Sequence, residues 1–298
     1  MPIKKPQHMT PSVMGCPMLQ IVEGCAHGKC RFCSIYADAP FKLIPEEEID
    51  EDLNTLAQTI RPDQTRINLI GGNPYTLPMK KLIPVLDKIK EKLPHVTSFG
   101  GFCRITDIAN KTDEELLLLR EYGVNDLSIG AESGWDEALF FMKKGHTSKD
   151  VAEQGQRLHK AGIDFTYFYL TGMAGAGKGQ QNAIESAKAY SEAAPGHILV
   201  VCMTPTNDWP LAEDIKAGRW NAPSEVEMVE EIRTFIEHLD CNTYVNCSHD
   251  TDIIRFEGLV PKDQENMIKL IDNRLPKMNP KAARKVRELL HGATFEVA

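Results

Sequence analysis

The chain has 298 residues and a formal net charge of −8. Its length suits one large domain or two small ones. The acidic balance makes nucleic acid a poor candidate for the main partner, because phosphate backbones are bound by clusters of Lys and Arg. The first residues are not followed by the apolar run of a signal peptide, and no stretch approaches the roughly 20 apolar residues that a membrane span needs. We therefore expect a cytoplasmic protein that does not bind a membrane.

Short apolar segments alternate with amphipathic segments over the first two thirds of the chain. The expected strands begin near residues 18, 66, 96, 126, 165 and 197, and the expected helices span 46–60, 79–92, 112–122, 135–142, 148–161 and 182–192. A spacing of roughly thirty residues between strands is typical of βα units with a parallel sheet. Six such units form an open barrel or a doubly wound sheet. In both cases ligands bind at the C-terminal ends of the strands.

The pattern changes after residue 204. Helices are expected at 224–239, 261–275 and 280–290, and one further strand at 243–247. We therefore predict a core over residues 1–204 and a mostly helical extension over 205–298 that packs on the core at the substrate side.

Three cysteines near the start, Cys25, Cys30 and Cys33, lie within nine residues. The other five are scattered, as is typical of core filling in a reducing compartment. Three thiolates are one too few for a closed tetrahedral zinc site, but an iron–sulfur cluster held by three of them keeps one iron open for another ligand. A zinc site that uses His27 as the fourth ligand is the alternative.

The spacing Cys-x4-Cys-x2-Cys, with Phe32 before the last cysteine, resembles the cluster loop of radical S-adenosylmethionine (SAM) enzymes, in which the first gap is usually one residue shorter. Three later segments resemble that superfamily in the expected order. They are Gly71-Gly72-Asn73-Pro74 after the second strand, Ile129-Gly-Ala-Glu-Ser-Gly134 after the fourth and Tyr167-Phe-Tyr-Leu-Thr-Gly172 after the fifth. The second of these is closest to the subgroup of oxygen-independent coproporphyrinogen III oxidase.

This resemblance implies an α/β fold, a partial (β/α)6 TIM-type barrel with the helical extension described above. It also implies a [4Fe–4S] cluster on Cys25, Cys30 and Cys33. The residues it implies for binding SAM are Phe32, Tyr36, Gly71, Gly72, Asn73, Pro74, Arg104, Glu132, Ser133 and Thr171.

The implied reaction is reductive cleavage of SAM to a 5′-deoxyadenosyl radical that abstracts hydrogen from a substrate. The electron comes from a donor such as flavodoxin or ferredoxin, and a small molecule is favoured over a macromolecule as substrate. Such a cluster also favours an anaerobic host. The barrel keeps water and stray hydrogen donors away from the radical.

Three residues are candidates for catalysis. Tyr169 lies on the aromatic fifth strand, and Cys247 and His249 lie in a polar segment after the strand expected at 243–247. Cys247 would donate a hydrogen atom and His249 would act as a general acid or base. Tyr167 lies on the same face of that strand, and the sequence does not decide which of the two tyrosines faces the site. The alternative for the other two residues is a polar loop at the barrel rim.

The segment Gly172-Met-Ala-Gly-Ala-Gly-Lys178-Gly179 is close to a phosphate-binding loop. Gly179 stands where Ser or Thr would bind Mg²⁺. Two alternatives to a radical enzyme therefore stay open: a zinc-stabilised α/β binding protein, and a nucleotide hydrolase that uses Lys178.

Overall fold

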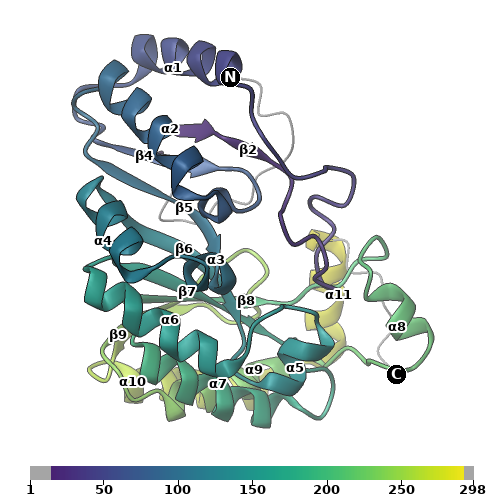
Figure 1. The fold of residues 1–298 in the computed structure, drawn as a ribbon. Coiled ribbons are helices and arrows are strands. Elements are labelled where there is room, and N and C mark those ends of the chain that lie inside the picture. Colours follow the sequence, from purple (N-terminus) through teal and green to yellow (C-terminus); the bar gives the residue numbers. More distant parts are fainter. Residues whose placement is uncertain (1–14, 292–298) are drawn as a thin grey trace. The chain divides into compact units, whose positions relative to one another are not determined.

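A computed structural model describes residues 15–291 of the chain (Figure 1). The first residues, on which the prediction about a signal peptide rests, lie outside the described range. The strands of the large sheet are β1 (Met18–Gln20), β4 (Arg66–Ile70), β5 (Ser98–Arg104), β6 (Val124–Glu132), β7 (Phe165–Thr171), β8 (His197–Cys202), β9 (Thr243–Cys247) and β10 (Phe256–Val260). A separate ribbon pairs β2 (Val22–Glu23) with β3 (Lys42–Leu43).

Helices follow most strands of the large sheet. They are α1 (Glu46–Thr59), α2 (Met79–Lys92), α3 (Ile105–Ala109), α4 (Asp113–Glu121), α5 (Asp136–Phe141), α6 (Ser148–Ala161), α7 (Gly179–Ala193), α8 (Ala212–Lys216), α9 (Glu225–His238), α10 (Gln264–Arg274) and α11 (Pro280–His291), with short 3₁₀ turns η2 (Pro74–Thr76) and η3 (Leu275–Lys277).

The strand order of the large sheet is β1-β4-β5-β6-β7-β8-β9-β10. The pairs β1–β4, β4–β5, β7–β8 and β8–β9 are parallel, and β10 runs antiparallel to β9. All six predicted strands are present, and the further strand expected at 243–247 is β9. The structure adds β10, which the sequence pattern did not indicate.

The predicted helix starts are explained by local capping. Thr112 accepts a hydrogen bond from the Glu115 backbone (3.2 Å) while the Glu115 carboxylate accepts from the Thr112 backbone (2.9 Å). Ser224 and Glu227 form the same reciprocal box at the start of α9. Each box satisfies two backbone N–H groups that the helix itself leaves without partners.

The chain divides into two compact units. The first consists, within the described range, of residues 15–28, 35–129 and 157–165. It holds β1, β4 and β5 with helices α1 to α4, and its interior is filled by apolar side chains such as Leu19, Ile67 and Phe99. The strands alternate with helices because each strand is apolar on both faces and must be covered on both.

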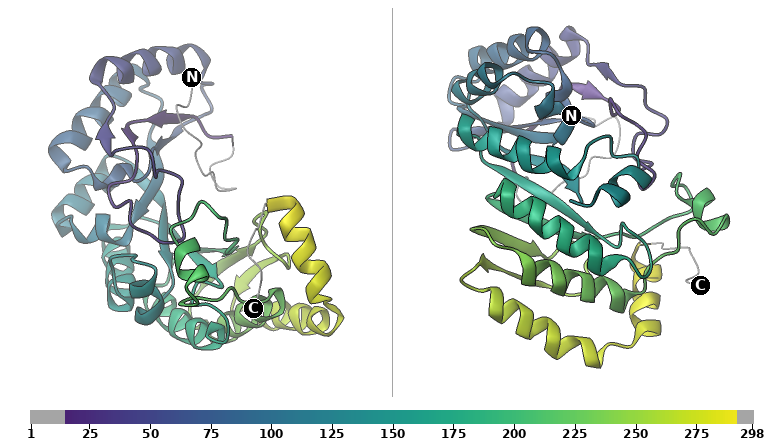
Figure 2. Two further views of the ribbon diagram at one scale, coloured as in Figure 1. Left: turned by 90° about the vertical axis from the view of Figure 1, so that its right-hand side faces the viewer. Right: turned by 60° about the horizontal axis from the view of Figure 1, so that its bottom comes forward.

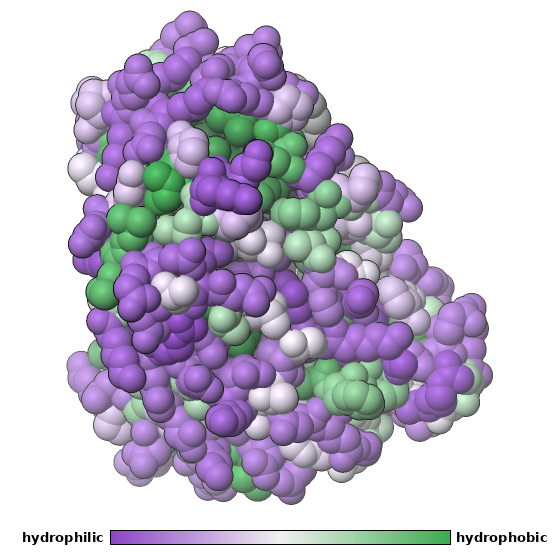
Figure 3. Space-filling model, viewed as in Figure 1, coloured by the Kyte–Doolittle hydropathy of each residue, from purple (hydrophilic) through white to green (hydrophobic). Residues whose placement is uncertain are grey.

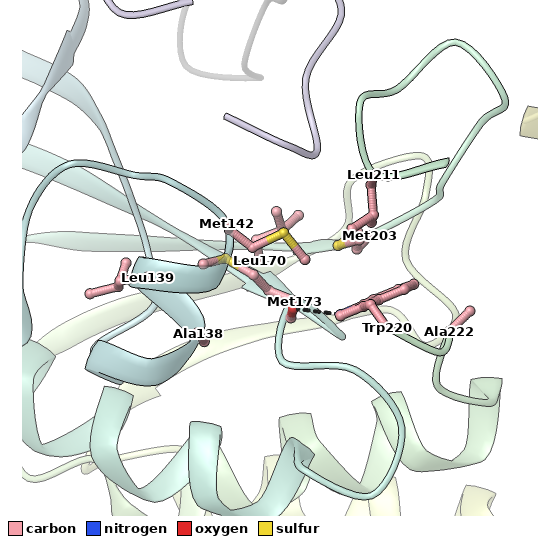
Figure 4. Packing of buried hydrophobic residues seen from close by; sticks show 9 residues of the cluster. All are labelled: Ala138, Leu139, Met142, Leu170, Met173, Met203, Leu211, Trp220 and Ala222. Carbon is pink, nitrogen blue, oxygen red and sulfur yellow. Dashed lines mark hydrogen bonds between the residues drawn. The ribbon is translucent and has the colours of Figure 1, made fainter. Parts of the chain in front are cut away.

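The second unit consists of residues 29–34, 130–156 and 166–291 within the described range. Here α9 lies between α7 and α10 (Figures 1 and 2). At the C-terminal ends of β7 and β8, an apolar cluster packs around Met142, Met173, Met203 and Trp220 (Figure 4). The Trp220 indole N–H donates to the Met173 carbonyl (3.2 Å), which satisfies the one polar atom of that side chain.

The face seen in Figure 3 is mainly hydrophilic, interrupted by apolar groups. Within residues 15–291, no helix is both long enough and apolar enough to cross a membrane.

Candidate active site

The three clustered cysteines are free thiols, each partly exposed. The loop that carries them has no helix or strand between residues 24 and 34. Within residues 15–291, no three His, Cys, Asp or Glu side chains are grouped closely enough to hold a metal ion. The three thiols therefore lie close together in the sequence, on one loop without a helix or strand. Three thiolates, which are soft ligands, fit an iron–sulfur cluster.

The turn Gly71-Gly72 closes on the first part of this loop. The Gly72 N–H donates to the Gly24 carbonyl (2.9 Å). A Cβ at Gly72 would stand 2.2 Å from the Gly24 oxygen and 2.6 Å from the Cys25 Cα. Gly71 has φ +130°, and a Cβ there would stand 2.3 Å from a Val22 methyl group. Both positions therefore need glycine, because a side chain at Gly72 would push the Cys25 backbone away and a side chain at Gly71 would clash with Val22.

Asn73, which follows, is fully buried. Its Oδ1 accepts from the Ala26 N–H (2.9 Å), and its Nδ2 donates to both carboxylate oxygens of Asp107 (3.1 Å each). Asp107 also accepts from the Arg104 N–H (2.8 Å). Burial raises the pKa of Asp107, and these hydrogen bonds act against that rise. The Asn73 side chain thus links the cysteine loop to the end of β5, and the buried Pro74 starts η2 behind it.

Within the second unit, residues 29–34 of the loop are held by three partners. The Arg31 N–H donates to the Met142 carbonyl (3.1 Å), and the Arg31 carbonyl accepts from the Leu211 N–H (2.8 Å). The Arg31 guanidinium lies 3.2 Å from the Asp214 carboxylate. The Cys33 N–H donates to the Cys30 carbonyl (3.3 Å), which turns the chain between the two thiols.

Glu132, at the end of β6, has φ +69°, a strained conformation for a residue with a side chain. Its carboxylate lies 3.4 Å from the ammonium group of Lys144, which is buried and also stands 5.4 Å from the centroid of the Phe32 ring. A Cβ at Gly130 would stand 2.7 Å from the Glu132 carboxylate, so glycine leaves room for it. Sequence reasoning missed Lys144, although it lies in the family-like segment that follows Glu132.

The predicted contact Ser133 is fully buried and bonded within the protein. Its hydroxyl donates to Asn182 Oδ1 (2.6 Å) and accepts from the Trp135 N–H (3.0 Å). The neighbouring Gly134 N–H donates to the Ser186 hydroxyl (2.8 Å). Ser133 therefore fastens the end of β6 to α7.

Tyr169 is likewise buried. Its ring stacks on Phe235 (centroids 3.9 Å apart), and its hydroxyl donates to Glu231 (2.8 Å). Glu231 also accepts from Asn182 Nδ2 (2.7 Å) and the Gly172 N–H (2.9 Å). Burial raises the pKa of Glu231 to about 7. Sequence reasoning missed this carboxylate, because a glutamate in a helix ordinarily faces solvent.

Two more predicted SAM contacts lie at loop and strand ends. Thr171 is buried at the end of β7, and within residues 15–291 its hydroxyl has no hydrogen-bond partner, which is expected of a group that meets a ligand. Tyr36 is partly buried, and its carbonyl accepts from the Ala39 N–H (3.1 Å).

The candidates after β9 have partners of their own. Cys247 is fully buried, its thiol donates to the Ile254 carbonyl (3.2 Å), and burial raises its pKa. The His249 ring lies 2.9 Å from the Thr251 hydroxyl, and the His249 N–H donates to Asp252 (2.8 Å). Catalytic roles for Tyr169, Cys247 and His249 stay predictions.

The glycine-rich segment after β7 does not present a lone lysine. The Lys178 ammonium pairs with the Glu137 carboxylate (2.5 Å) and lies 5.9 Å from the centroid of the Trp135 ring. Gly177 donates to Glu227 (2.9 Å), so the segment is anchored to α9.

Residues 19–187 match the model of the family described as the Radical SAM superfamily. The chain belongs to the radical SAM superfamily. The heme chaperone HemW of Bacillus subtilis is 29% identical over 143 residues, which are 45% of this chain and 38% of HemW. A tRNA uridine(34) acetyltransferase of Methanocaldococcus jannaschii is 22% identical over 215 residues, which are 58% of this chain and 39% of that protein. The matched region thus spans about two fifths of the length of these relatives.

The solved structure of coproporphyrinogen III oxidase (HemN) from Escherichia coli matches with a TM-score of 0.54 at 16% identity, over 74% of this chain and 52% of that chain. The predicted radical SAM fold, a partial TIM-type barrel with C-terminal helices, is confirmed. Membership in the family implies a [4Fe–4S] cluster, SAM and a source of electrons.

Proposed function

We propose that this protein cleaves SAM reductively at a cluster held by Cys25, Cys30 and Cys33, and uses the resulting radical to abstract hydrogen from a small molecule. The observation that carries the proposal is the hydrogen bond from Gly72 to Gly24, which seats the glycine turn directly against the backbone of Cys25. When bound, the cluster supplies the electron that breaks the bond between sulfur and C5′ of SAM.

The protein's own residues bind and orient SAM. Backbone groups of Gly71 and Gly72 would meet its amino group and Arg104 its carboxylate. Glu132, strained and partly exposed beside Lys144, would accept from the ribose hydroxyls. The buried Thr171 hydroxyl, which has no hydrogen-bond partner within residues 15–291, would meet the adenine side. The Lys144 ammonium, 3.4 Å from the Glu132 carboxylate, supports this role because it holds the side chain in place.

The buried residues behind these contacts have a supporting part. Asn73 fixes the cysteine loop, and Ser133 with Asn182 fixes the end of β6. Phe32 and Tyr36, which lie in or just after the cysteine loop, would pack beside the cluster and the adenine of SAM. A low-polarity surround of this kind excludes water from a reactive species.

The electron donor would be a flavodoxin or a ferredoxin, and we place the protein in the cytoplasm of an anaerobic or oxygen-protected cell. The relatives named above act on different molecules, so the choice of substrate belongs to residues outside the shared core. A small-molecule substrate agrees with the acidic charge of the chain, which disfavours nucleic acid.

The test is anaerobic reconstitution with iron and sulfide, reduction, addition of SAM and assay of 5′-deoxyadenosine. Cys30→Ala should lose both bound iron and product. Cys241→Ala, a partly buried cysteine outside the loop, is the matched control and should retain both. Tightly bound zinc with intact SAM would contradict the proposal and favour a structural zinc site. Mg²⁺-dependent ATP or GTP turnover that Lys178→Ala abolishes would favour the hydrolase.

A further inference from the structure

A cavity of about 530 Å³ opens between the loop that follows β9 and the last two helices of the described chain. Its walls come from residues 250–255, from 274–279 and from one face of α11. All of these segments belong to the second compact unit. The volume is in the range typical of sites for small molecules.

The charges around this cavity are mainly positive although the whole chain is acidic. Arg255, Arg274, Lys277 and Arg287 line it, and the acidic residues there are Asp250 and Asp252. Arg274 and Lys277 are exposed and form no ion pair with any residue in the range 15–291, whereas Arg255 lies 3.6 Å from Asp250.

Asp252 does not neutralise these cations, because its carboxylate faces the backbone. One oxygen accepts from the Cys202 N–H (3.1 Å) and the other from the His249 N–H (2.8 Å). Burial raises the pKa of Asp252 to about 7, so part of the population is neutral near that pH. The side chain thus acts as a brace between the ends of β8 and β9.

Arg287 ties the cavity to the same strand ends. Its guanidinium donates to the Met203 carbonyl (2.5 Å) and the Thr204 hydroxyl (2.6 Å), directly after β8, and to Glu225 (3.2 Å). Its Nε is buried and has no partner in the described chain. Because β8 and β9 are parallel, the cavity lies at their C-terminal edge, where sheets of this kind bind ligands.

One residue that lines the cavity also contacts the apolar cluster of this unit, because Arg287 donates to the Met203 carbonyl. Met203 belongs to the apolar cluster of Figure 4, and Phe32 packs against that cluster.

We propose that this cavity binds the carboxylate or phosphate group of a small anionic ligand through Arg255, Arg274 and Lys277. We identify this ligand with the substrate of the enzyme, and that identification rests on the function proposed above. Arg274 and Lys277, which form no ion pair within residues 15–291, can give charge-assisted hydrogen bonds, and the fixed Arg287 adds a positive charge behind them. The limited volume and the acidic chain favour a small molecule over a nucleic acid.

The test is calorimetric titration of the reconstituted full chain with inorganic phosphate and, separately, with glutarate. At least one anion should bind saturably. The anion that binds more tightly shows whether the ligand carries a phosphate or a carboxylate group. Arg274→Glu/Lys277→Glu should weaken that binding by about tenfold or more, since two charged contacts are reversed. Lys80→Glu/Lys81→Glu, two exposed lysines of α2, makes the same change in charge and should leave the affinity unaltered.

No saturable binding of either anion would overturn the proposal, as would equal loss in both double variants, which would indicate attraction by net charge alone. Circular dichroism checks that the variants fold, and Arg274→Ala/Lys277→Ala gives a milder version of the same test. Because titration needs no SAM cleavage, failure here is distinct from failure of the radical reaction.

Discussion

Asn73 has two neighbours with opposite needs. The Ala26 N–H requires an acceptor, and the Asp107 carboxylate requires a donor. A carboxamide offers one of each, whereas a glutamate at this position would bring a second carboxylate against Asp107. The pairing of Asn73 with a buried aspartate therefore explains why an amide stands in this turn.

Exchanging the two side chains should reveal this pairing. Asn73→Asp places two carboxylates together, and we expect the unfolding free energy of the apoprotein to fall by about 1–3 kcal/mol, with less iron bound after reconstitution. Asp107→Asn added to it restores a donor and an acceptor in reversed order, so the double variant should recover most of both. Urea unfolding and iron analysis measure the two effects.

Asn110→Asp, an exposed position after α3, serves as control and should change neither quantity. If the double variant were no better than Asn73→Asp alone, the link between the two side chains would not matter to the loop.

Among single residues, the sequence reveals those whose role follows from their spacing to neighbours in the chain. The three cysteines and the Gly71-Gly72 turn could be found because their neighbours in the chain define them. The partners of Ser133 and Tyr169 could not, since Asn182 and Glu231 lie on helices that the chain reaches 49 and 62 residues later. Only the folded chain shows that these two side chains face the interior.

Among the elements, α9 was predicted correctly as a helix, but its main contribution to the fold, the buried Glu231, was not predicted. Its capping box marks its start, and its apolar residues mark its buried face. Yet Glu231 on that face binds β7, α7 and the segment after β7 through three donors. By contrast, α3 and α8 were missed because five residues are too few to show a helical period. β10 was missed because Gly258 stands on its buried face and Leu259 on its exposed face, so apolar and polar residues do not alternate along it.

The buried Glu231 should make stability depend on pH. Its pKa in the folded state is about 7, against 4.5 for the free side chain, so folding favours the protonated form. Its contribution is therefore complete below pH 4.5, and it is lost as pH rises to about 7, by at most about 3 kcal/mol. Glu231→Gln cannot ionise, and urea unfolding between pH 4.5 and 8 should show a smaller loss for this variant than for the wild type.

Glu230→Gln, the exposed neighbour, should follow the wild-type curve. Asp252, whose pKa is also raised to about 7, shifts stability in the same direction and leaves a residual slope in every variant. Parallel curves for wild type and Glu231→Gln would show that Glu231 titrates normally in the folded protein.

For the molecule as a whole, the strand and helix rhythm was sufficient to predict βα units with a parallel sheet, because a buried parallel sheet imposes apolar strands at regular intervals. The choice of a barrel over a doubly wound sheet came from the resemblance to radical SAM enzymes. The same rhythm does not describe how the last hundred residues join it. β9 pairs with β8 across the boundary predicted at residue 204, and α11 is fixed by the buried pair of Arg287 and Glu225. The paired residues of β8 and β9 are 47 positions apart and Arg287 and Glu225 are 62 apart, and periodicity does not encode such distant contacts.

The Arg287–Glu225 pair should decide whether the C-terminal segment unfolds with the rest of its unit. Both side chains are almost inaccessible (5% and 2% exposed), so Arg287→Ala leaves a buried carboxylate with only Arg284, 3.7 Å away. We expect a loss of about 3 kcal/mol or more in the unfolding free energy, and a smaller loss for Arg287→Lys, which keeps the charge but not the fork of donors. Urea unfolding followed by circular dichroism measures both. Arg284→Ala, which leaves Arg287 in place, should cost much less; equal losses for the two alanine variants would mean that α11 does not depend on this pair.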